Sequence, residues 1–163
     1  MKKQISLSTK TEIKASPNRI WKTIVDVRNY RYWNPFIQYS DGDLREALDL
    51  NALLRLSDKQ YDVRLQILRI ITDFELRLSL KSCRSFQHLL NGELIFSITP
   101  MHDNNDGNIN NDDNLLSMFE QRGGFKGFRV NGFSIRKAFE NMSCALKTVT
   151  ENTNLKPCIF LYS

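Results

Sequence analysis

The sequence contains few cysteines and no long apolar run. Its three cysteines, Cys83, Cys144 and Cys158, lie far apart and lack the close pairing of metal ligands. We therefore expect reduced thiols in a cytoplasmic protein, without a disulfide framework. The longest apolar runs, such as residues 159–162, fall far short of the ~20 residues that cross a bilayer, so stable membrane insertion is not expected. Residues 1–15 alternate apolar and polar side chains instead of forming the apolar core of a secretion signal.

The sequence also lacks a concentrated run of one charge. It has 23 Lys and Arg against 18 Asp and Glu, a formal net charge of +5, but the basic residues are spread along the whole chain. A nucleic-acid-binding domain gathers such residues on a patch or stripe. We interpret the charge as a solvated basic surface and expect no nucleic-acid partner.

Histidine is scarce, which limits the catalytic sites that the chain can form. Only His88 and His102 are available to a Ser/His/Asp or Cys/His constellation. His88 shares a predicted strand face with Leu90 and Phe96, so it is either a general base in a cavity or, as we favour, a hydrogen-bonded histidine of the core or rim. No glycine-rich phosphate loop is present.

An Asn- and Asp-rich stretch follows residue 101. Its carboxylates and amides are typical calcium ligands, but it lacks the sixth-position glycine and the terminal glutamate of a helix-loop-helix calcium site. Asx turns explain the composition without a metal. We predict a mobile hairpin tip over residues 101–114, no metal site and no cofactor.

The first part of the chain contains clear local signals. Apolar residues and threonines alternate with polar ones over residues 5–13, which predicts a half-buried strand. Ser16 and Pro17 form a helix start, and the apolar spacing that follows predicts a helix over residues 17–28. Pro35 then restricts residues 30–33 to a short helical turn.

The middle and end of the chain alternate mainly as strands do. Residues 42–56 are ambiguous between helix and strand, whereas residues 61–71 and 74–81 predict an antiparallel pair that reverses at Thr72 and Asp73, with a bulge near Ile67. Further strands are predicted over residues 86–98 and 115–128, the latter with a bulge at Gly123 and Gly124. A long amphipathic helix over residues 133–151 is the only element long enough to cover the sheet.

Several short motifs accompany this order of elements: ASPNRIW at residues 15–21, WNPF at 33–36, FKGF at 125–128 and the helical segment 139–147. With them, the chain resembles the START-related helix-grip superfamily (SRPBCC) over residues 4–152. That superfamily includes birch-pollen-allergen-like and polyketide cyclase/dehydrase-like proteins.

The resemblance implies an α+β helix-grip fold, in which a curved antiparallel β-sheet wraps around a long C-terminal α-helix and two short helices follow the first strand. It implies a single domain over residues 1–163, with a core of 4–152 and a C-terminal tail of 153–163, and it assigns residues 48–57 to a strand. The chain departs from the family in two ways. Gly123 stands where an acidic residue is frequent, and the Asn- and Asp-rich stretch is an insertion.

In the family, the turn that carries tryptophan-asparagine-proline lies under the mouth of a cavity between the sheet and the terminal helix. Trp33 and Phe36 are therefore either ligand contacts or plain core. The inward faces of the predicted strands and helix complete the candidate ligand-binding set, which is Trp33, Phe36, Leu78, His88, Phe96, Phe139 and Met142.

Three functions follow from the resemblance. Binding of a small hydrophobic or amphipathic molecule, lipid or polyketide-like, is the first, because a cavity walled by Leu, Phe and Met buries apolar surface with few polar anchors. The second is a cyclase- or dehydratase-type enzyme, which would need an inward polar group such as His88, Tyr61 or Glu120. The third is a protein-interaction module of the chaperone-activator type. Fold alone does not decide among them.

Overall fold

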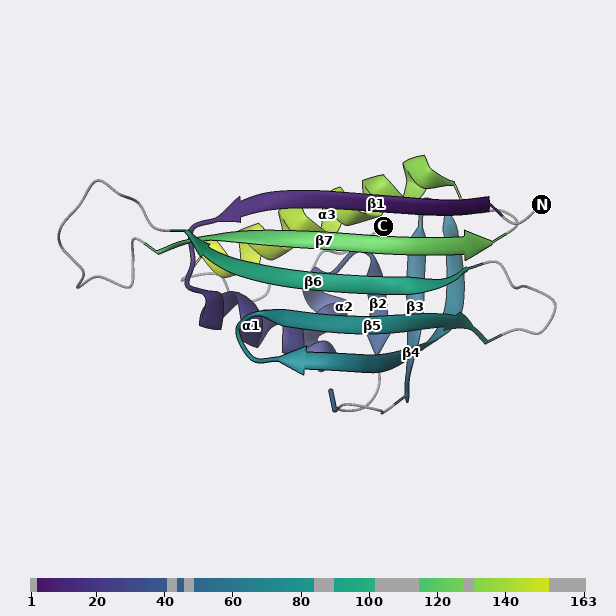
Figure 1. Cartoon of the computed structure of the whole chain (residues 1–163), viewed down its shortest axis with the longest axis horizontal. Helices are drawn as coiled ribbons and strands as arrows, with labels where there is room; N and C mark the ends of the chain where they lie inside the picture. Colours follow the sequence, from purple (N-terminus) through teal and green to yellow (C-terminus); the bar gives the residue numbers. More distant parts are fainter. Residues whose placement is uncertain are drawn as a thin grey trace.

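Seven strands form one antiparallel sheet in the computed structural model, which describes residues 3–40, 44–45, 49–83, 90–101, 115–127 and 131–152 (Figure 1). The strands are β1 (Lys3–Ile13), β2 (Ile37–Ser40), β3 (Asp49–Leu56), β4 (Lys59–Ile71), β5 (Glu75–Ser82), β6 (Asn91–Met101) and β7 (Leu116–Gly127). Their order across the sheet is β1-β7-β6-β5-β4-β3-β2. Neighbours in space are thus neighbours in sequence, except that β1 pairs with β7.

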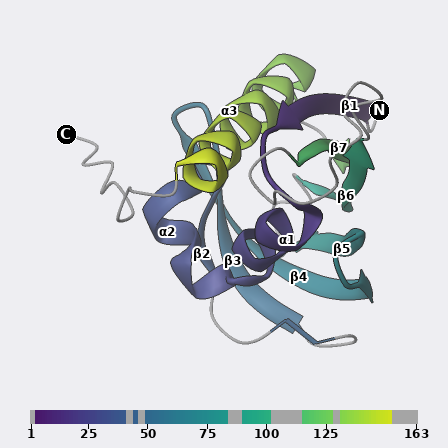
Figure 2. The same ribbon diagram turned by 90° about the vertical axis from the view of Figure 1, so that its left-hand side faces the viewer.

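The helices lie on the inner side of a curled sheet. They are α1 (Pro17–Val25), the 3₁₀ helix η1 (Val27–Asn29), α2 (Tyr30–Trp33) and α3 (Gly132–Glu151). Seen end-on, the sheet bends from β1 round to β2, and α3 lies across the open side between these edges (Figure 2). This arrangement confirms the predicted α+β helix-grip fold.

The start of the fold follows its local signals. Odd-numbered residues of β1 are more buried than even-numbered ones, as the alternation predicted. The Ser16 side chain accepts a hydrogen bond from the Arg19 backbone N at 3.3 Å and caps α1, with Pro17 at the first turn. The helix ends at Val25, earlier than predicted, because the chain tightens into η1 before α2.

Residues 49–56 form a strand, which the resemblance implied and the local pattern left open. Leu50, Ala52, Leu54 and Leu56 are buried on the inner face of β3, while the residues between them are more exposed. Burial against the core outweighs the helical propensity of this leucine-rich segment.

The β4–β5 reversal is also confirmed. Asp73 has φ 60°, a left-handed conformation that aspartate tolerates, and its Oδ1 accepts a hydrogen bond from Asn18 Nδ2 at 3.2 Å. The register shifts between Ile67 and Arg69, where a bulge was predicted. Phe74, the first residue of the strand predicted over residues 74–81, lies instead in this turn and is 48% exposed.

The predicted bulge at Gly123 and Gly124 is wrong. Both glycines pair in continuous register with β1 and with β6. Gly123 is required for a different reason, because a Cβ there would lie 2.5 Å from the Phe125 ring and 2.8 Å from the Phe139 ring. The small residue provides room for the aromatic core and leaves the ladder uninterrupted.

The long terminal helix has its predicted face inward. Asn131 caps α3, and its buried residues include Ile135, Phe139, Met142 and Leu146. The strand predicted over residues 86–98 runs on to Met101. His88, the loop over residues 102–114 and the tail over 153–163 lie outside the described residues, so the predictions for them stay predictions. Within the described part, no helix is long and apolar enough to cross a membrane.

Candidate functional site

The inner face of the sheet is lined mainly by apolar side chains. Strands β5, β6 and β7 place every second residue on this face, and most of these side chains are fully buried: Leu76, Leu78, Leu80, Leu94, Phe96, Ile98, Phe119 and Phe125. The buried face of α3 closes on them from the opposite side. Leucine, isoleucine and aromatic side chains therefore make up most of the surfaces that the sheet and the helix turn toward each other.

Phe139 joins three elements at the middle of this interior. Its ring centroid lies 5.8 Å from that of Phe36, which follows α2, and 6.0 Å from that of Phe125 on β7. Tilted and edge-on aromatic pairs at such distances contribute about 0.5–1.5 kcal/mol each beyond their burial. The ring thus couples the terminal helix to the sheet and to the segment after α2.

Six of the seven residues predicted to contact a ligand belong to one buried core. These are Trp33, Phe36, Leu78, Phe96, Phe139 and Met142. Among them, Phe36 and Phe139 are in direct ring contact, and Phe96 packs against Phe119 with centroids 6.1 Å apart. The seventh, His88, is outside the described residues. Contact of any of the seven with a ligand stays a prediction.

Asn34 fixes the path of the chain between α2 and β2. Its Oδ1 accepts hydrogen bonds from the backbone N of Phe36 and of Ile37, both at 2.9 Å, in an Asx-type turn. The side chain is 2% exposed, and its Nδ2 has no hydrogen-bond partner in the structure. The tryptophan-asparagine-proline motif therefore directs Phe36 into the core.

Tyr30 packs against Trp33 and so helps to hold the same segment in place. Its hydroxyl donates to the Ile24 carbonyl, and its ring meets the Trp33 ring edge-on at 5.2 Å. Burial, and to a smaller extent the negative charge of Asp26, raise the pKa of the Tyr30 phenol well above its usual value.

This shift predicts a loss of stability in alkaline solution. The unfolded chain releases the Tyr30 proton near pH ~10 while the folded state retains it, so the stabilising contribution is complete below that pH and declines above it. We expect the free energy of unfolding to fall more steeply above pH ~10 in the wild type than in Tyr30→Phe. At neutral pH the variant should lose about 1 kcal/mol with its hydrogen bond. Urea denaturation across this range measures both effects, and parallel pH profiles would refute the first.

One fully buried amide interrupts the apolar interior. Gln121 on β7 is 0% exposed, and its Nε2 donates to the Phe139 carbonyl at 2.9 Å and to Ser143 Oγ at 2.6 Å on α3. A carbonyl oxygen can only accept a hydrogen bond, so the atom of Gln121 that faces the Phe139 carbonyl must be Nε2 and not Oε1. Gln121 was not among the predicted site residues, although its place in the alternation of residues 117, 119, 121, 123 and 125 marks a polar residue at a core position.

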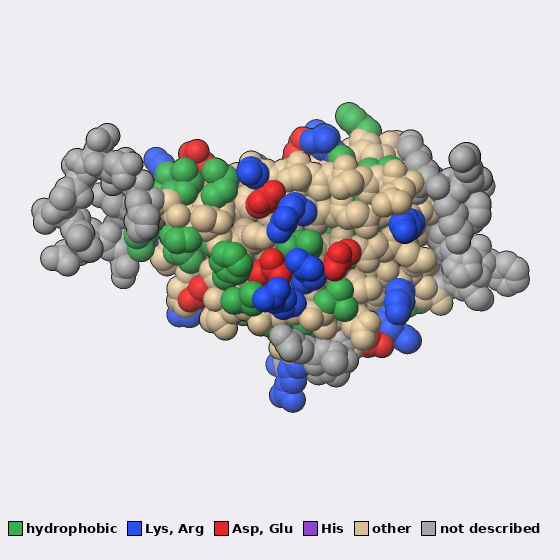
Figure 3. Space-filling view, viewed as in Figure 1, with side chains coloured by type: hydrophobic (Ala, Val, Ile, Leu, Met, Phe, Trp, Pro, Cys, Tyr) green, Lys and Arg blue, Asp and Glu red, His purple; other side chains and the backbone are tan. Residues whose placement is uncertain are grey.

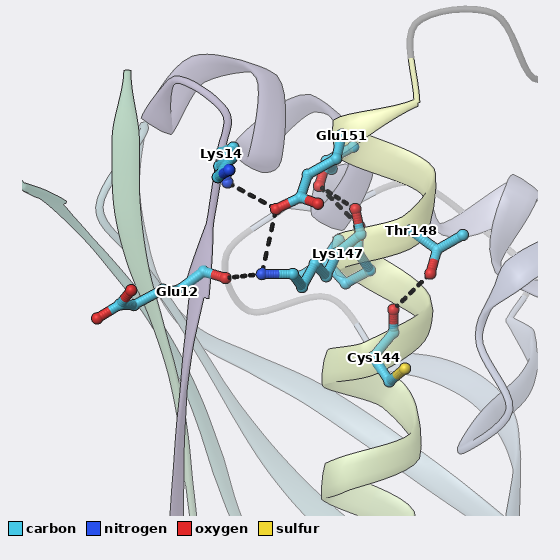
Figure 4. Close-up of polar contacts among 8 residues, drawn as sticks. Glu12, Lys14, Cys144, Lys147, Thr148 and Glu151 are labelled. Atoms are coloured by element: carbon cyan, nitrogen blue, oxygen red, sulfur yellow. Dashed lines mark hydrogen bonds and ion pairs between the residues drawn. The ribbon is translucent and has the colours of Figure 1, made fainter. Parts of the chain in front are cut away.

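The C-terminal end of α3 is tied to the end of β1 (Figure 4). Lys147 Nζ donates to the Glu12 carbonyl at 2.7 Å, and Glu151 Oε1 accepts from the Lys14 backbone N at 2.8 Å. Lys147 and Glu151 also form an ion pair at 3.2 Å, which contributes little on its own because both side chains are partly solvated. These contacts hold the helix across the curled sheet.

Of the polar side chains considered for catalysis, the structure describes Glu120 and Tyr61. Ser8 Oγ donates to Glu120 Oε1 at 3.0 Å, and Arg122 Nε lies 4.0 Å from the same atom, which places Glu120 on the outer face of the sheet. Acidic and basic side chains intermingle across the middle of that face (Figure 3). Tyr61 packs, partly buried, against the core. Within the described ranges, no three His, Cys, Asp or Glu residues gather as a metal site requires.

Comparison with known proteins identifies the architecture. Neither a protein-family model nor a curated protein matches this sequence. Solved structures do: a START superfamily protein from Mycobacterium smegmatis is similar with a TM-score of 0.67 and 17% identity, covering 90% of this chain and 97% of that one. A conserved protein from Geobacillus kaustophilus has a TM-score of 0.68, 11% identity and coverages of 90% and 95%.

The protein XoxI from Bacillus cereus is similar at a TM-score of 0.64 and 14% identity, with coverages of 93% and 99%. At these identities the likeness concerns the fold, and it extends over nearly the whole length of each chain. The chain therefore has the helix-grip fold of START-related proteins.

Proposed function

We propose that this protein binds a small hydrophobic or amphipathic molecule between the inner face of the sheet and α3. The observation that carries the proposal is the composition of that interior, which is apolar and aromatic with a few buried amide and hydroxyl groups. Sites that bury most of a small ligand have this composition, because apolar walls supply the binding energy and isolated polar groups fix the orientation.

The placement of α3 supports the proposal. The helix packs against β1 on one side and against α1, α2 and β3 on the other, so it bridges the curled sheet (Figure 2). Side chains of the central strands, such as Leu78 and Phe96, are buried on the inner face of the same sheet. A molecule that replaced some of these side-chain contacts would keep the apolar surface of the walls out of water.

The chemistry of the buried polar groups favours binding over the cyclase or dehydratase alternative. Asn34, Gln121 and Ser143 carry amides and a hydroxyl, which form hydrogen bonds with backbone groups or with one another. Such groups orient a ligand, whereas acid–base catalysis needs a side chain that gains or loses a proton near neutral pH. Glu120, one of the candidates for that role, lies on the outer face.

Binding of diphenylhexatriene tests the proposal, because this hydrocarbon has no polar group and fluoresces in apolar surroundings. We expect saturable binding to the folded protein, with Trp33 emission quenched more than Trp21 emission. Trp33 belongs to α2, directly before the Phe36 segment, whereas Trp21 lies in α1. Trp21→Phe and Trp33→Phe variants separate the two signals.

The contrary result is equally specific. If the probe bound only in denaturant that partly unfolds the chain, and neither tryptophan responded, the interior would be filled by its own side chains. The protein-interaction alternative would then replace ligand binding.

A further inference from the structure

Two neighbouring residues on the inner face of the sheet have buried polar atoms without hydrogen-bond partners. Gln121 Oε1 on β7 and Thr9 Oγ1 on β1 are both inaccessible to solvent, and neither has a hydrogen-bond partner among the described residues. The two residues are direct partners in the β1–β7 ladder. Directly opposed residues have Cβ atoms about 4.5–5.5 Å apart, so the two side chains are neighbours under α3.

Two unpaired polar atoms side by side in the interior are unusual, because each of them lowers the stability of the fold. Leaving one buried donor or acceptor unpaired costs about 1–3 kcal/mol, and native proteins keep few such groups. The rest of the Gln121 amide is well satisfied, since Nε2 has two partners on α3. The arrangement therefore holds Oε1 in place as a free acceptor, beside a threonine hydroxyl that can donate.

We propose that Gln121 Oε1 and Thr9 Oγ1 together bind a hydroxyl group of the molecule held between the sheet and α3. This inference rests on the function proposed above and specifies the class of ligand as an apolar molecule that carries an alcohol or phenol. Its hydroxyl donates to Gln121 Oε1 and accepts from Thr9 Oγ1, which satisfies both atoms at once.

Other polar groups fit the pair less well. An ionised carboxylate only accepts, so it would place a negative charge against Gln121 Oε1. An ammonium only donates, and would enter this apolar interior as an unpaired charge. A hydroxyl is neutral and can both donate and accept a hydrogen bond. The apolar remainder of the ligand would lie against Phe96, which pairs with Gln121 on its other side, and against Phe139.

Two isomers, 1-decanol and methyl nonyl ether, isolate the donated hydrogen bond. They have the same atoms and nearly the same apolar surface, but the ether has no O–H. Displacement of diphenylhexatriene gives the Kd of each, and the readout is the ether-to-alcohol Kd ratio. We expect this ratio to fall roughly three- to tenfold in Gln121→Met, the effect of one neutral hydrogen bond. Thr9→Val removes the second contact and should raise the Kd of the alcohol.

Ser117→Ala is the matched control. Ser117 is also a buried polar residue on the inner face of β7, but its Oγ already donates to the Ala15 carbonyl at 2.7 Å. This variant should leave the Kd ratio unchanged. If Gln121→Met does not fold, as circular dichroism would reveal, Thr9→Val decides the question alone.

The outcomes distinguish this inference from the proposed function. Unchanged affinities for the alcohol in Gln121→Met and Thr9→Val, with the probe still bound, would overturn the hydroxyl site and leave apolar binding intact. Failure of both isomers to displace the probe would also overturn the hydroxyl site. Failure of diphenylhexatriene to bind the wild type would remove the proposed function itself.

Discussion

Replacing Phe139 by alanine should lower the free energy of unfolding by about 3–5 kcal/mol. The side chain is fully buried and contacts the Phe36 and Phe125 rings, so its removal leaves a cavity at the junction of α3, β7 and the segment after α2. Neighbouring rings held by separate elements cannot all move in to fill it. Urea or guanidinium denaturation of the purified variant measures the loss.

Phe133→Ala provides the matched control on the same helix. Phe133 is 76% exposed at the start of α3, so the same chemical change should alter stability by no more than about 0.5 kcal/mol. Equal denaturation midpoints for the wild type and Phe139→Ala would mean that α3 is not docked on the sheet. Equal losses in the two variants would mean that helix propensity, and not the core, is responsible.

Gly123→Ala should destabilise the protein by about 1–3 kcal/mol through overpacking. The added Cβ would lie 2.5 and 2.7 Å from Phe125 ring atoms and 2.8 Å from the Phe139 ring. Both rings are fully buried, so neither can turn toward solvent to make room. The denaturation midpoint should therefore fall although the substitution adds apolar surface.

The neighbouring Gly124 provides a control, because replacing it tests the general effect of removing a glycine from a strand without the steric clash. A Cβ on Gly124 would meet no atom of the described residues within 4 Å. Gly124→Ala should therefore leave stability unchanged or raise it by up to about 1 kcal/mol, since alanine restricts the unfolded chain. A similar loss in both variants would refute the close approach of the aromatic rings to Gly123.

Much of the fold was predictable because local and global signals agree. The alternation in β1, the Ser16–Pro17 helix start and the Thr72–Asp73 reversal each favour the conformation that the sheet also requires. In residues 49–56 the local and global signals disagree. The leucines favour a helix locally, and only pairing with the neighbouring strand makes the extended conformation more stable. The glycine pair was misread for the same reason, since the rings that Gly123 accommodates are distant in sequence.

The candidate site was less accessible to prediction. Alternation correctly placed Phe96, Phe139 and Met142 in the interior, because an inward face is a local property of a strand or helix. The unpaired atoms of Thr9 and Gln121 are not local. They depend on the β1–β7 register and on the orientation that the Phe139 carbonyl imposes on the amide. A sequence shows which residues are polar, but not which of their atoms lack partners.

The pairing of β1 with β7 also sets the order in which the molecule can be completed during synthesis. Ser8 and Glu120, linked across these strands, are 112 residues apart in the chain. At ribosomal rates of about 5–20 residues per second, β1 waits on the order of ten seconds for β7, the strand with which it pairs. The hydrogen bonds from Lys147 and to Glu151 then form later still. During that interval β1 offers unpaired edges to other chains, and the alternating Ser8, Lys10 and Glu12 on its outer face are the polar residues that discourage such contacts.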